Sequence, residues 1–268
     1  MFNLIWDVSP DIFSIGPITI RWYGLLFASS FIVGFYIMQK IFALESKKEN
    51  DLNDLVWYMI LGTVIGARLG HCFFYNPEYY LSNPIKILMV WEGGLASHGA
   101  AIGILIAVYL YSKKKKDQTY LWVLDRVVIT VALAGFFIRM GNLFNSEIIG
   151  KPSDLPWAVA FVNADVPDPM VPRHPAQFYE ALAYLMIFVL LIMIYRKRKQ
   201  DLNDGFIFGL FLFLVFTFRF FVEFIKEDQS AFEAGMILNM GQILSIPLIL
   251  GGIVLIIYSF RKQKQTGN

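Results

Sequence analysis

Two arginines and one histidine are the residues of this sequence best suited to chemistry. Arg139, Arg219 and His98 each lie in or at the edge of a long apolar stretch. A guanidinium group can donate two parallel hydrogen bonds to a phosphate and stabilise negative charge as it grows. A neutral histidine can take a proton from an incoming nucleophile. These residue types suit a displacement at a phosphodiester, although they do not identify which bond breaks.

The sequence lacks the motifs of several other enzyme classes. It contains no G-x-S-x-G, no H-E-x-x-H, no Walker phosphate loop and no paired-aspartate alcohol phosphotransferase pattern. Its single cysteine, Cys72, cannot form an intramolecular disulfide, and its three histidines have no paired spacing. We therefore expect no metal site, no cofactor and no nucleic-acid partner.

The elements that must position these residues are transmembrane helices. Of the 268 residues, 57% are hydrophobic and only 16% are charged, whereas a soluble domain carries about a quarter charged residues. A helix needs about 20 apolar residues to cross a bilayer. Seven stretches meet this need, at roughly 18–43, 54–74, 94–112, 119–141, 177–195, 205–225 and 238–260. The sequence predicts an all-α polytopic membrane protein with seven transmembrane helices.

The basic residues indicate how these helices are oriented. Clusters of lysine and arginine follow the first, third, fifth and seventh stretches, at 40–48, 113–116, 196–199 and 261–264. The opposite connections hold only Lys86, Lys151, Arg173 and Lys226. By the positive-inside rule, the N-terminus lies outside the cell and the C-terminus in the cytoplasm. We predict one transmembrane domain over residues 1–268, with a small extracytoplasmic cap at about 142–175.

Most arginines within the apolar stretches lie toward the outer face. Charges inside a membrane are costly and commonly mark a pathway, an ion pair or a site. Arg139 and Arg219 have a structural alternative, which is an ion pair with Glu147 or Glu223. Arg126, beside Asp125, lies near the cytoplasmic end and is interpreted as an anchor at the inner interface. The same outer depth receives several other polar residues: Arg21, Arg68, His98, Asn142, Asn145, His174, Gln177, Tyr179 and Glu180.

Glycines surround His98. Gly93 and Gly94 precede the third apolar stretch, where they favour a sharp entry or a close approach of backbone to a ligand. Gly99 and Gly103 form a small-xxx-small pattern, which is typical of close helix packing. His71, next to Cys72, is interpreted as a packing or interfacial residue.

Five sequence runs resemble the bacterial prolipoprotein diacylglyceryl transferase family. They are RWYG at 21–24, WEGGLASHG at 91–99, RMGNLFNSEIIG at 139–150, RHPAQFYE at 173–180 and RFFVEF at 219–224. They occur in the family's order over nearly the whole chain, and the run at 139–150 is highly specific. The resemblance implies transfer of the diacylglyceryl group of phosphatidylglycerol to the lipobox cysteine of a preprolipoprotein signal peptide, with release of glycerol phosphate. It also implies an enzyme of the bacterial inner membrane that acts on membrane lipids.

The resemblance carries site roles onto particular residues. His98 matches the family's essential histidine, and Arg139 and Arg219 are expected to hold the phosphate. The positions implied to bind or order substrate are Tyr23, Gly94, Gly99, Asn142, Asn145, Glu147, His174, Gln177 and Glu223. Val215 stands where the family often has a tyrosine, Ile138 where it usually has glycine and Lys226 where it has arginine.

Two other readings remain open at this level. A lipid-binding scaffold or inactive relative is compatible with the departures at Val215 and Ile138. A channel or transporter would need polar residues along a continuous path across the bilayer, whereas this sequence concentrates them in the outer half.

Overall fold

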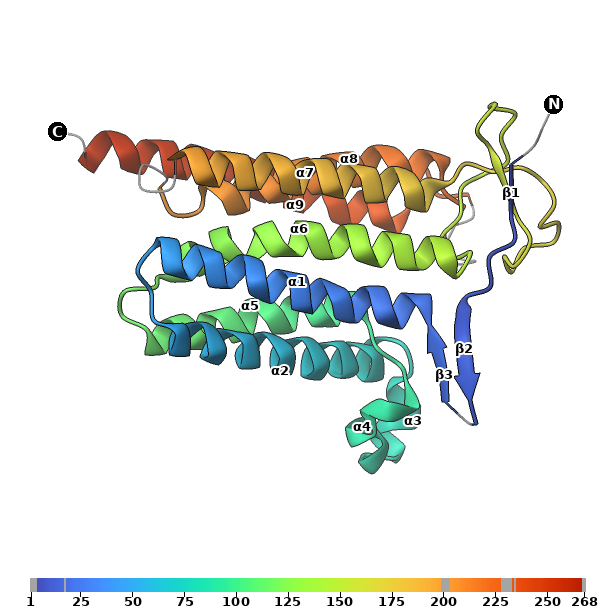
Figure 1. Ribbon diagram of the computed structural model, residues 1–268, viewed down its shortest axis with the longest axis horizontal. Coiled ribbons are helices and arrows are strands. Elements are labelled where there is room, and N and C mark those ends of the chain that lie inside the picture. Colours follow the sequence, from blue (N-terminus) through green and yellow to red (C-terminus); the bar gives the residue numbers. More distant parts are fainter. Residues whose placement is uncertain (1–3, 17, 199–202, 228–232, 234, 267–268) are drawn as a thin grey trace. The chain divides into compact units, whose positions relative to one another are not determined.

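The computed structural model describes residues 4–16, 18–198, 203–227, 233 and 235–266, the last five of these by their backbone alone. Within these residues, each of the seven predicted stretches coincides with a long helix (Figure 1). The helices are α1 (Trp22–Leu44), α2 (Glu49–Phe74), α5 (Ser97–Lys114), α6 (Tyr120–Phe144), α7 (Ala176–Arg198), α8 (Phe206–Val222) and α9 (Met240–Thr266). The first predicted stretch began four residues too early, because Ile18–Arg21 forms a strand.

Six of the described helices are long and apolar enough to cross a membrane. They are Trp22–Leu44, Glu49–Phe74, Tyr120–Phe144, Ala176–Arg198, Phe206–Ile225 and Met240–Arg261. Large apolar side chains such as Leu61, Ile65 and Met186 are more than half exposed on these helices, as lipid-facing residues are. The protein is therefore a multi-pass membrane protein. The helix outside this set is α5, which has 18 residues and ends in Lys113 and Lys114.

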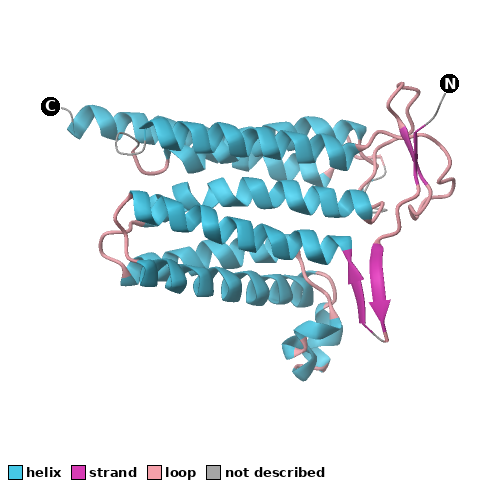
Figure 2. Ribbon diagram, viewed as in Figure 1, coloured by secondary structure: helices cyan, strands magenta, loops and turns pink. Residues whose placement is uncertain are grey.

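The fold is mostly helical, as predicted, but the described residues also form four short strands that the all-α prediction did not include (Figure 2). Strand β1 (Leu4–Trp6) pairs in parallel with β4 (Val159–Phe161), and β2 (Asp11–Ile15) pairs antiparallel with β3 (Ile18–Arg21). Strands of three to five residues are too short for an alternating pattern to stand out in the sequence. The described residues also form four short helices, α3 (Pro77–Ser82), α4 (Ile85–Leu88), η1 (Val90–Glu92) and η2 (Glu223–Ile225).

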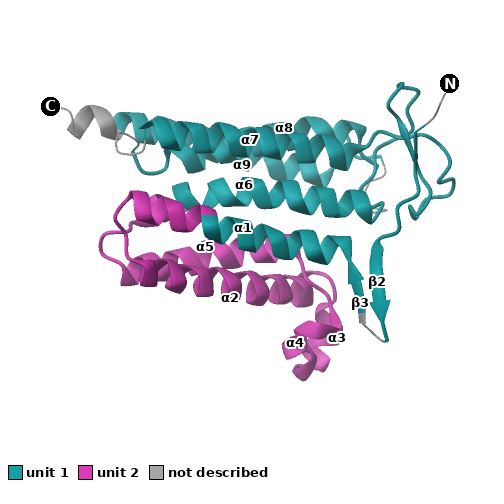
Figure 3. Ribbon diagram, in the orientation of Figure 1, with its two compact units in different colours: residues 1–36, 125–268 teal, residues 37–124 magenta. Residues whose placement is uncertain are grey.

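The chain forms two compact units, which are described separately (Figure 3). Unit 1 comprises residues 1–36 and 125–268, and unit 2 comprises residues 37–124. The backbone passes into unit 2 within α1 and returns to unit 1 within α6.

In unit 1, α8 and α9 pack closely through glycine. A Cβ added at Gly252 would lie 2.7 Å from the carbonyl oxygen of Gly209, so only glycine allows this approach. At the start of α8, the Asp125 carboxylate accepts hydrogen bonds from the backbone N–H groups of Gly205 and Phe208, each 2.7 Å long. The Asp125 and Arg126 side chains are buried. Asp125 therefore caps the start of α8, and Arg126 lies beside it, with Nη1 3.9 Å from the Asp125 carboxylate. The interpretation of Arg126 as an anchor at the inner interface stays a prediction.

In unit 2, α2 and α5 pack along two stripes of small residues. A Cβ at Gly62 would lie 2.7 Å from the carbonyl oxygen of Gly103, and one at Gly99 would lie 2.8 Å from the Cα of Gly70. Contacts of this kind confirm that the small-xxx-small pattern at Gly99 and Gly103 packs helices. The matching stripe on α2 is Gly62, Gly66 and Gly70.

The connection after α5 is fixed by ion pairs in the same unit. Lys115 contacts the carboxylates of Asp51 at 2.6 Å and Asp54 at 2.7 Å, and these hydrogen bonds raise its pKa. Lys47 contacts Asp117 at 2.7 Å, and this hydrogen bond lowers the pKa of that carboxyl. The basic residues near this end of the helices thus also stabilise the turns there.

Candidate active site

A buried ion pair joins α6 to α7 in unit 1. The Arg139 side chain is only 11% exposed, and its Nη2 lies 3.1 Å from Oε1 of the fully buried Glu180. Its Nη1 donates a 3.1 Å hydrogen bond to Oδ1 of Asn142, one turn further along α6. The sequence offered Glu147 or Glu223 as the ion-pair partner of Arg139, and the structure instead brings Glu180 to it. Glu180 lies one turn after Gln177 on α7, so it shares a helix face with this predicted site residue. That spacing was the signal in the sequence that could have identified Glu180.

A second arginine pair lies at the end of α8. Nε of Arg219 is 3.6 Å from Oε1 of Glu223, four residues further on, as the helical spacing predicted. The Glu223 side chain is 3% exposed, whereas that of Arg219 is 37% exposed. Glu223 also accepts a 3.2 Å hydrogen bond from the amide of Asn239, and Gly241 leaves room for its carboxylate. Arg219 is thus held at Nε, while more than a third of its side chain remains exposed.

Lys226 connects the two pairs. Its Nζ lies 2.8 Å from Oε1 of Glu223 and 3.6 Å from Oε2 of Glu180, and its side chain is 2% exposed. The result is one continuous chain of charges in the order Arg139, Glu180, Lys226, Glu223, Arg219. The sequence placed Lys226 in an outer connection and did not indicate that its side chain is buried. That burial depends on how the loop after α8 folds back.

Two backbone contacts fold that loop back. The backbone N–H of Lys151 donates to the carbonyl of Ile225 at 2.8 Å, and the backbone N–H of Glu227 donates to the carbonyl of Ile149 at 3.2 Å. The Arg173 guanidinium pairs with the Glu227 carboxylate. The segment between α6 and α7 therefore covers Lys226 and holds it beside both carboxylates.

The turn after α6 gathers the predicted polar residues around Glu147. Oε2 of Glu147 accepts a 3.3 Å hydrogen bond from the amide of Asn142, and Oε1 accepts a 3.1 Å bond from that of Asn145. The amide of the buried Gln177 donates to the backbone carbonyl of Glu147 at 2.6 Å. Asn142 thus contacts Arg139 with its oxygen and Glu147 with its nitrogen.

Tyr23 and His174 also lie in unit 1. A Cβ at Gly141 would be 2.7 Å from the Tyr23 ring, so glycine lets this ring pack against α6 beside Asn142. The backbone carbonyl of His174 accepts a 2.9 Å hydrogen bond from Gly150, and its Nδ1 is 3.5 Å from the hydroxyl of Tyr179. His174 therefore ties the covering segment to the start of α7.

His98, Gly94 and Gly99 lie in unit 2. His98 is exposed at the start of α5, and its Nε2 lies 3.0 Å from the hydroxyl of Tyr75. Gly94 has a φ of +67°, which favours glycine, and Gly99 packs against α2. The structure thus groups Arg139 and Arg219 in unit 1 and places His98 in unit 2.

Arg68, also in unit 2, is buried, and within the residues that the structure describes its guanidinium contacts no carboxylate. Its guanidinium donates to the backbone carbonyls of Ile87, Lys86 and Gly93, the first at 3.0 Å. This intramembrane arginine therefore supports the connection between α2 and α5.

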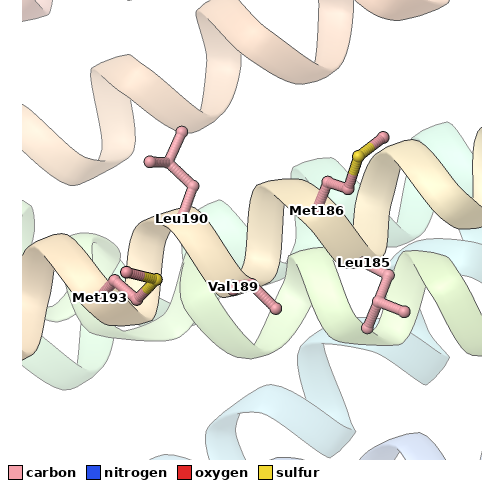
Figure 4. Close-up of a pocket in the computed structure, with 5 residues that line it drawn as sticks. All are labelled: Leu185, Met186, Val189, Leu190 and Met193. Carbon is pink, nitrogen blue, oxygen red and sulfur yellow. The ribbon is translucent and has the colours of Figure 1, made fainter.

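An apolar hollow lies on α7, with a volume of about 360 Å³. The residues that line it are Leu185, Met186, Val189, Leu190 and Met193, all from this one helix (Figure 4). It has no polar side chain and therefore offers no group for chemistry. The described residues contain no group of three or more His, Cys, Asp or Glu side chains that could hold a metal ion.

The charged chain in unit 1 is suited to bind an anion. In this chain, three cations contact two carboxylates directly. The chain therefore carries one positive charge in excess. Burial weakens screening by water, so such a charge attracts a phosphate more strongly than a surface cation does. The exposed part of Arg219 is where a phosphate could reach this charge.

Comparison with known proteins identifies the family of this chain. The family described as prolipoprotein diacylglyceryl transferase matches residues 10–258. The chain is 51% identical to the phosphatidylglycerol--prolipoprotein diacylglyceryl transferase of Chloroherpeton thalassium, over 97% of this chain and 96% of that protein. It is 48% identical to the protein of the same name from Tolumonas auensis, over 97% of this chain and 99% of the other. This chain belongs to the prolipoprotein diacylglyceryl transferase family.

Proposed function

We propose that this protein transfers the diacylglyceryl group of phosphatidylglycerol to the lipobox cysteine thiol of a preprolipoprotein signal peptide. The products are a thioether-linked lipid and glycerol phosphate, and the reaction is the first step of bacterial lipoprotein maturation. Family membership and the shared name of the relatives support the transferase activity and both substrates. The observation that carries the proposal is the buried charge chain, with its excess positive charge and the partly exposed side chain of Arg219.

The reaction needs a nucleophile, an electrophilic carbon and a stabilised leaving group. The thiolate of the acceptor cysteine attacks the glyceryl carbon that is bonded to the phosphate oxygen. The carbon–oxygen bond breaks, and its electron pair leaves with the phosphate. The leaving oxygen gains negative charge, which a fixed cation stabilises without reorganisation. His98 is the proposed base that takes the thiol proton.

The two arginines differ in exposure, and this assigns them different tasks. Arg219 is anchored at Nε and 37% exposed, so its remaining N–H groups can contact the phosphate. Arg139 is 11% exposed and already bonded to Glu180 and Asn142. We therefore assign the main phosphate contact to Arg219 and assign Arg139 to the positive field and to the order of the pocket.

The remaining proposed substrate-binding residues surround these groups. Asn142 and Asn145 hold Glu147, whose exposed carboxylate can accept hydrogen bonds from the glycerol hydroxyls of the headgroup. The other proposed contacts with substrate or with its ordering groups are Tyr23, Gly94, Gly99, His174, Gln177 and Glu223.

The proposed location is the bacterial inner membrane, with the site toward the outer leaflet. The charge chain is built from the end of α6, the start of α7 and the end of α8, which all lie at one end of their helices. The basic clusters follow the opposite ends. We propose seven spans, which are the six apolar helices named above and α5, with an outer N-terminus and a cytoplasmic C-terminus. The whole chain forms one transmembrane domain, and the segment at about 142–175 is its extracytoplasmic cap.

Purified protein in liposomes of phosphatidylglycerol, supplied with a lipobox peptide, tests the activity. Mass spectrometry should detect the diacylglyceryl thioether on the peptide, and a peptide with serine in place of cysteine should remain unmodified. Loss of one charged donor typically lowers the rate about 10²- to 10³-fold, so Arg219→Ala should lower kcat by this order while the fold is retained. Lipid binding without thioether formation, with the peptide shown to reach the membrane, would support an inactive lipid-binding relative.

A further inference from the structure

The end of α2 presents three side chains to the connection that leads to His98. Arg68, His71 and Tyr75 are spaced three and four residues apart, so they share one face of the helix. Arg68 holds the carbonyls of Gly93 and Lys86, as described above. The Tyr75 ring contacts His98 at the start of α5, and the His71 ring lies against Tyr75 and Gly94.

These rings form a stack that ends on His98. The His71 and Tyr75 ring centroids are 5.5 Å apart with an interplanar angle of 14°, and those of Tyr75 and His98 are 6.0 Å apart at 15°. The Tyr75 hydroxyl lies 3.0 Å from Nε2 of His98. The hydrogen-bond contact and the nearly parallel ring planes together fix the plane and the rotation of the His98 ring.

The base of the stack is itself held in place. A Cβ at Gly94 would lie 2.6 Å from Nε2 of His71, so the absence of a side chain lets the His71 ring lie against this loop. Arg68 bonds to the carbonyl of Gly93 in the same loop. The support for His98 thus extends from the buried Arg68 through Gly94 and His71 to Tyr75.

The position of the Tyr75 hydroxyl determines which nitrogen of His98 can accept a proton. Nε2 is engaged by the phenol, so Nδ1 is the nitrogen left for a substrate. A neutral imidazole carries one proton, and the nitrogen without it is the acceptor. His98 can act as a base at Nδ1 only if Nε2 carries the proton and donates it to the phenol oxygen.

We propose that Tyr75 is a positioning residue that holds His98 in the tautomer protonated at Nε2, with the lone pair of Nδ1 directed to the acceptor thiol. This inference rests on the proposed function. The thiol proton passes to Nδ1, and the resulting thiolate forms the carbon–sulfur bond as the carbon–oxygen bond to phosphate breaks. The imidazolium keeps its Nε2–H bond to Tyr75 and then releases the Nδ1 proton to water, which restores the base.

The tautomer can be measured without any reaction. The chain has three histidines, so selective ¹⁵N labelling of histidine in nanodiscs gives three ring systems, which His71→Gln and His174→Gln assign. In the wild-type protein, we expect the protonated nitrogen of neutral His98 to be Nε2. In Tyr75→Phe, which keeps the ring but removes the hydroxyl, we expect a mixture of tautomers. A wild-type His98 protonated at Nδ1 would overturn the proposal.

Turnover provides the second measurement. The net contribution of one neutral hydrogen bond corresponds to roughly a tenfold change, so Tyr75→Phe should lower kcat roughly tenfold with little change in KM for phosphatidylglycerol. The matched control is Tyr79→Phe on α3, since the Tyr79 ring contacts Tyr80, and it should turn over like wild type. Unchanged kcat and an unchanged tautomer in Tyr75→Phe would refute the role of Tyr75. The proposed function would still stand in that case if the wild-type protein is active. An inactive wild type with the Nε2 tautomer would count against the function instead.

Discussion

Replacement of Glu180 by glutamine would remove the negative charge that lies between Arg139 and Lys226. Glutamine has nearly the same shape, so the change isolates charge from packing. Arg139 is 3.1 Å from this carboxylate and Lys226 is 3.6 Å from it. At an effective dielectric constant of about 20, one ion pair at the shorter distance is worth about 5 kcal/mol before the cost of desolvation. The removal of the carboxylate also removes its own desolvation cost, so the net loss is smaller than the sum of both pairs.

We expect Glu180→Gln to lower the free energy of unfolding by about 3–5 kcal/mol, as for other buried pairs that lose one partner. Neutral hydrogen bonds between membrane helices are worth only about 0.6 kcal/mol on average. A loss of that smaller size would mean that no buried charge had been left without its partner. We also expect reduced turnover, because Arg139 loses the group that fixes its orientation.

The measurement is reversible unfolding by SDS in mixed micelles, with Asp11→Asn as the matched control. The carboxylate of Asp11 lies 3.0 Å from Nε of Arg21, almost the same distance as in the buried pair. Both of those side chains are exposed, at 42% and 64%, so the control should lose about 1 kcal/mol or less. Equal small losses for Glu180→Gln and Asp11→Asn would refute the reasoning, because burial would then have no effect.

A double-mutant cycle with Lys226→Met tests whether the charges act as one chain. Each single change leaves a buried charge without one of its partners, whereas the double change removes one cation and one carboxylate together. We expect the double variant to lose less stability than the two single variants combined. Strict additivity would mean that Lys226 and Glu180 do not interact.

Three further outcomes are expected. Gly99→Ala should lower stability by about 1–3 kcal/mol through overpacking against α2, whereas Gly24→Ala, where a Cβ meets nothing within 4 Å, should not; equal SDS midpoints would contradict the packing. Asp125→Asn should cost about 1–2 kcal/mol in the same assay, because it weakens the hydrogen bonds from two backbone N–H groups of α8. Lys47 lowers the pKa of Asp117, so this pair contributes stability above the unfolded pKa that is lost as the pH falls through the folded pKa. Asp117→Asn should therefore reduce the acid dependence of unfolding, and an unchanged dependence would contradict the pairing.

Local spacing made part of the site predictable from the sequence. Arg219 and Glu223 are four residues apart on one helix, and their pairing follows from helical geometry alone. The small residues at Gly99 and Gly103 likewise indicated a packed helix face, which the contacts with α2 confirm. In both cases the signal lies within one or two turns of a single helix.

Contacts between distant segments were not predictable in this way. The structural alternative for Arg139 was an ion pair with Glu147 or Glu223, but the packing of α7 against α6 brings Glu180 to it. Lys226 was expected in an outer connection, and its burial was not predicted, because it depends on contacts between the loop after α8 and the segment before α7. Tyr75 had no assigned role, because its contact with His98 depends on how α2 and α5 pack.

The sequence by itself determined that the protein spans a membrane and which polar residues gather at one end of its helices. This is because a run of about 20 apolar residues has no other stable environment, and charges within such runs are rare enough to be informative. Only the tertiary structure decided which charges touch, namely the order Arg139, Glu180, Lys226, Glu223 and Arg219. A side chain's partner depends on the rotation and packing of separate helices, which no spacing along one chain specifies.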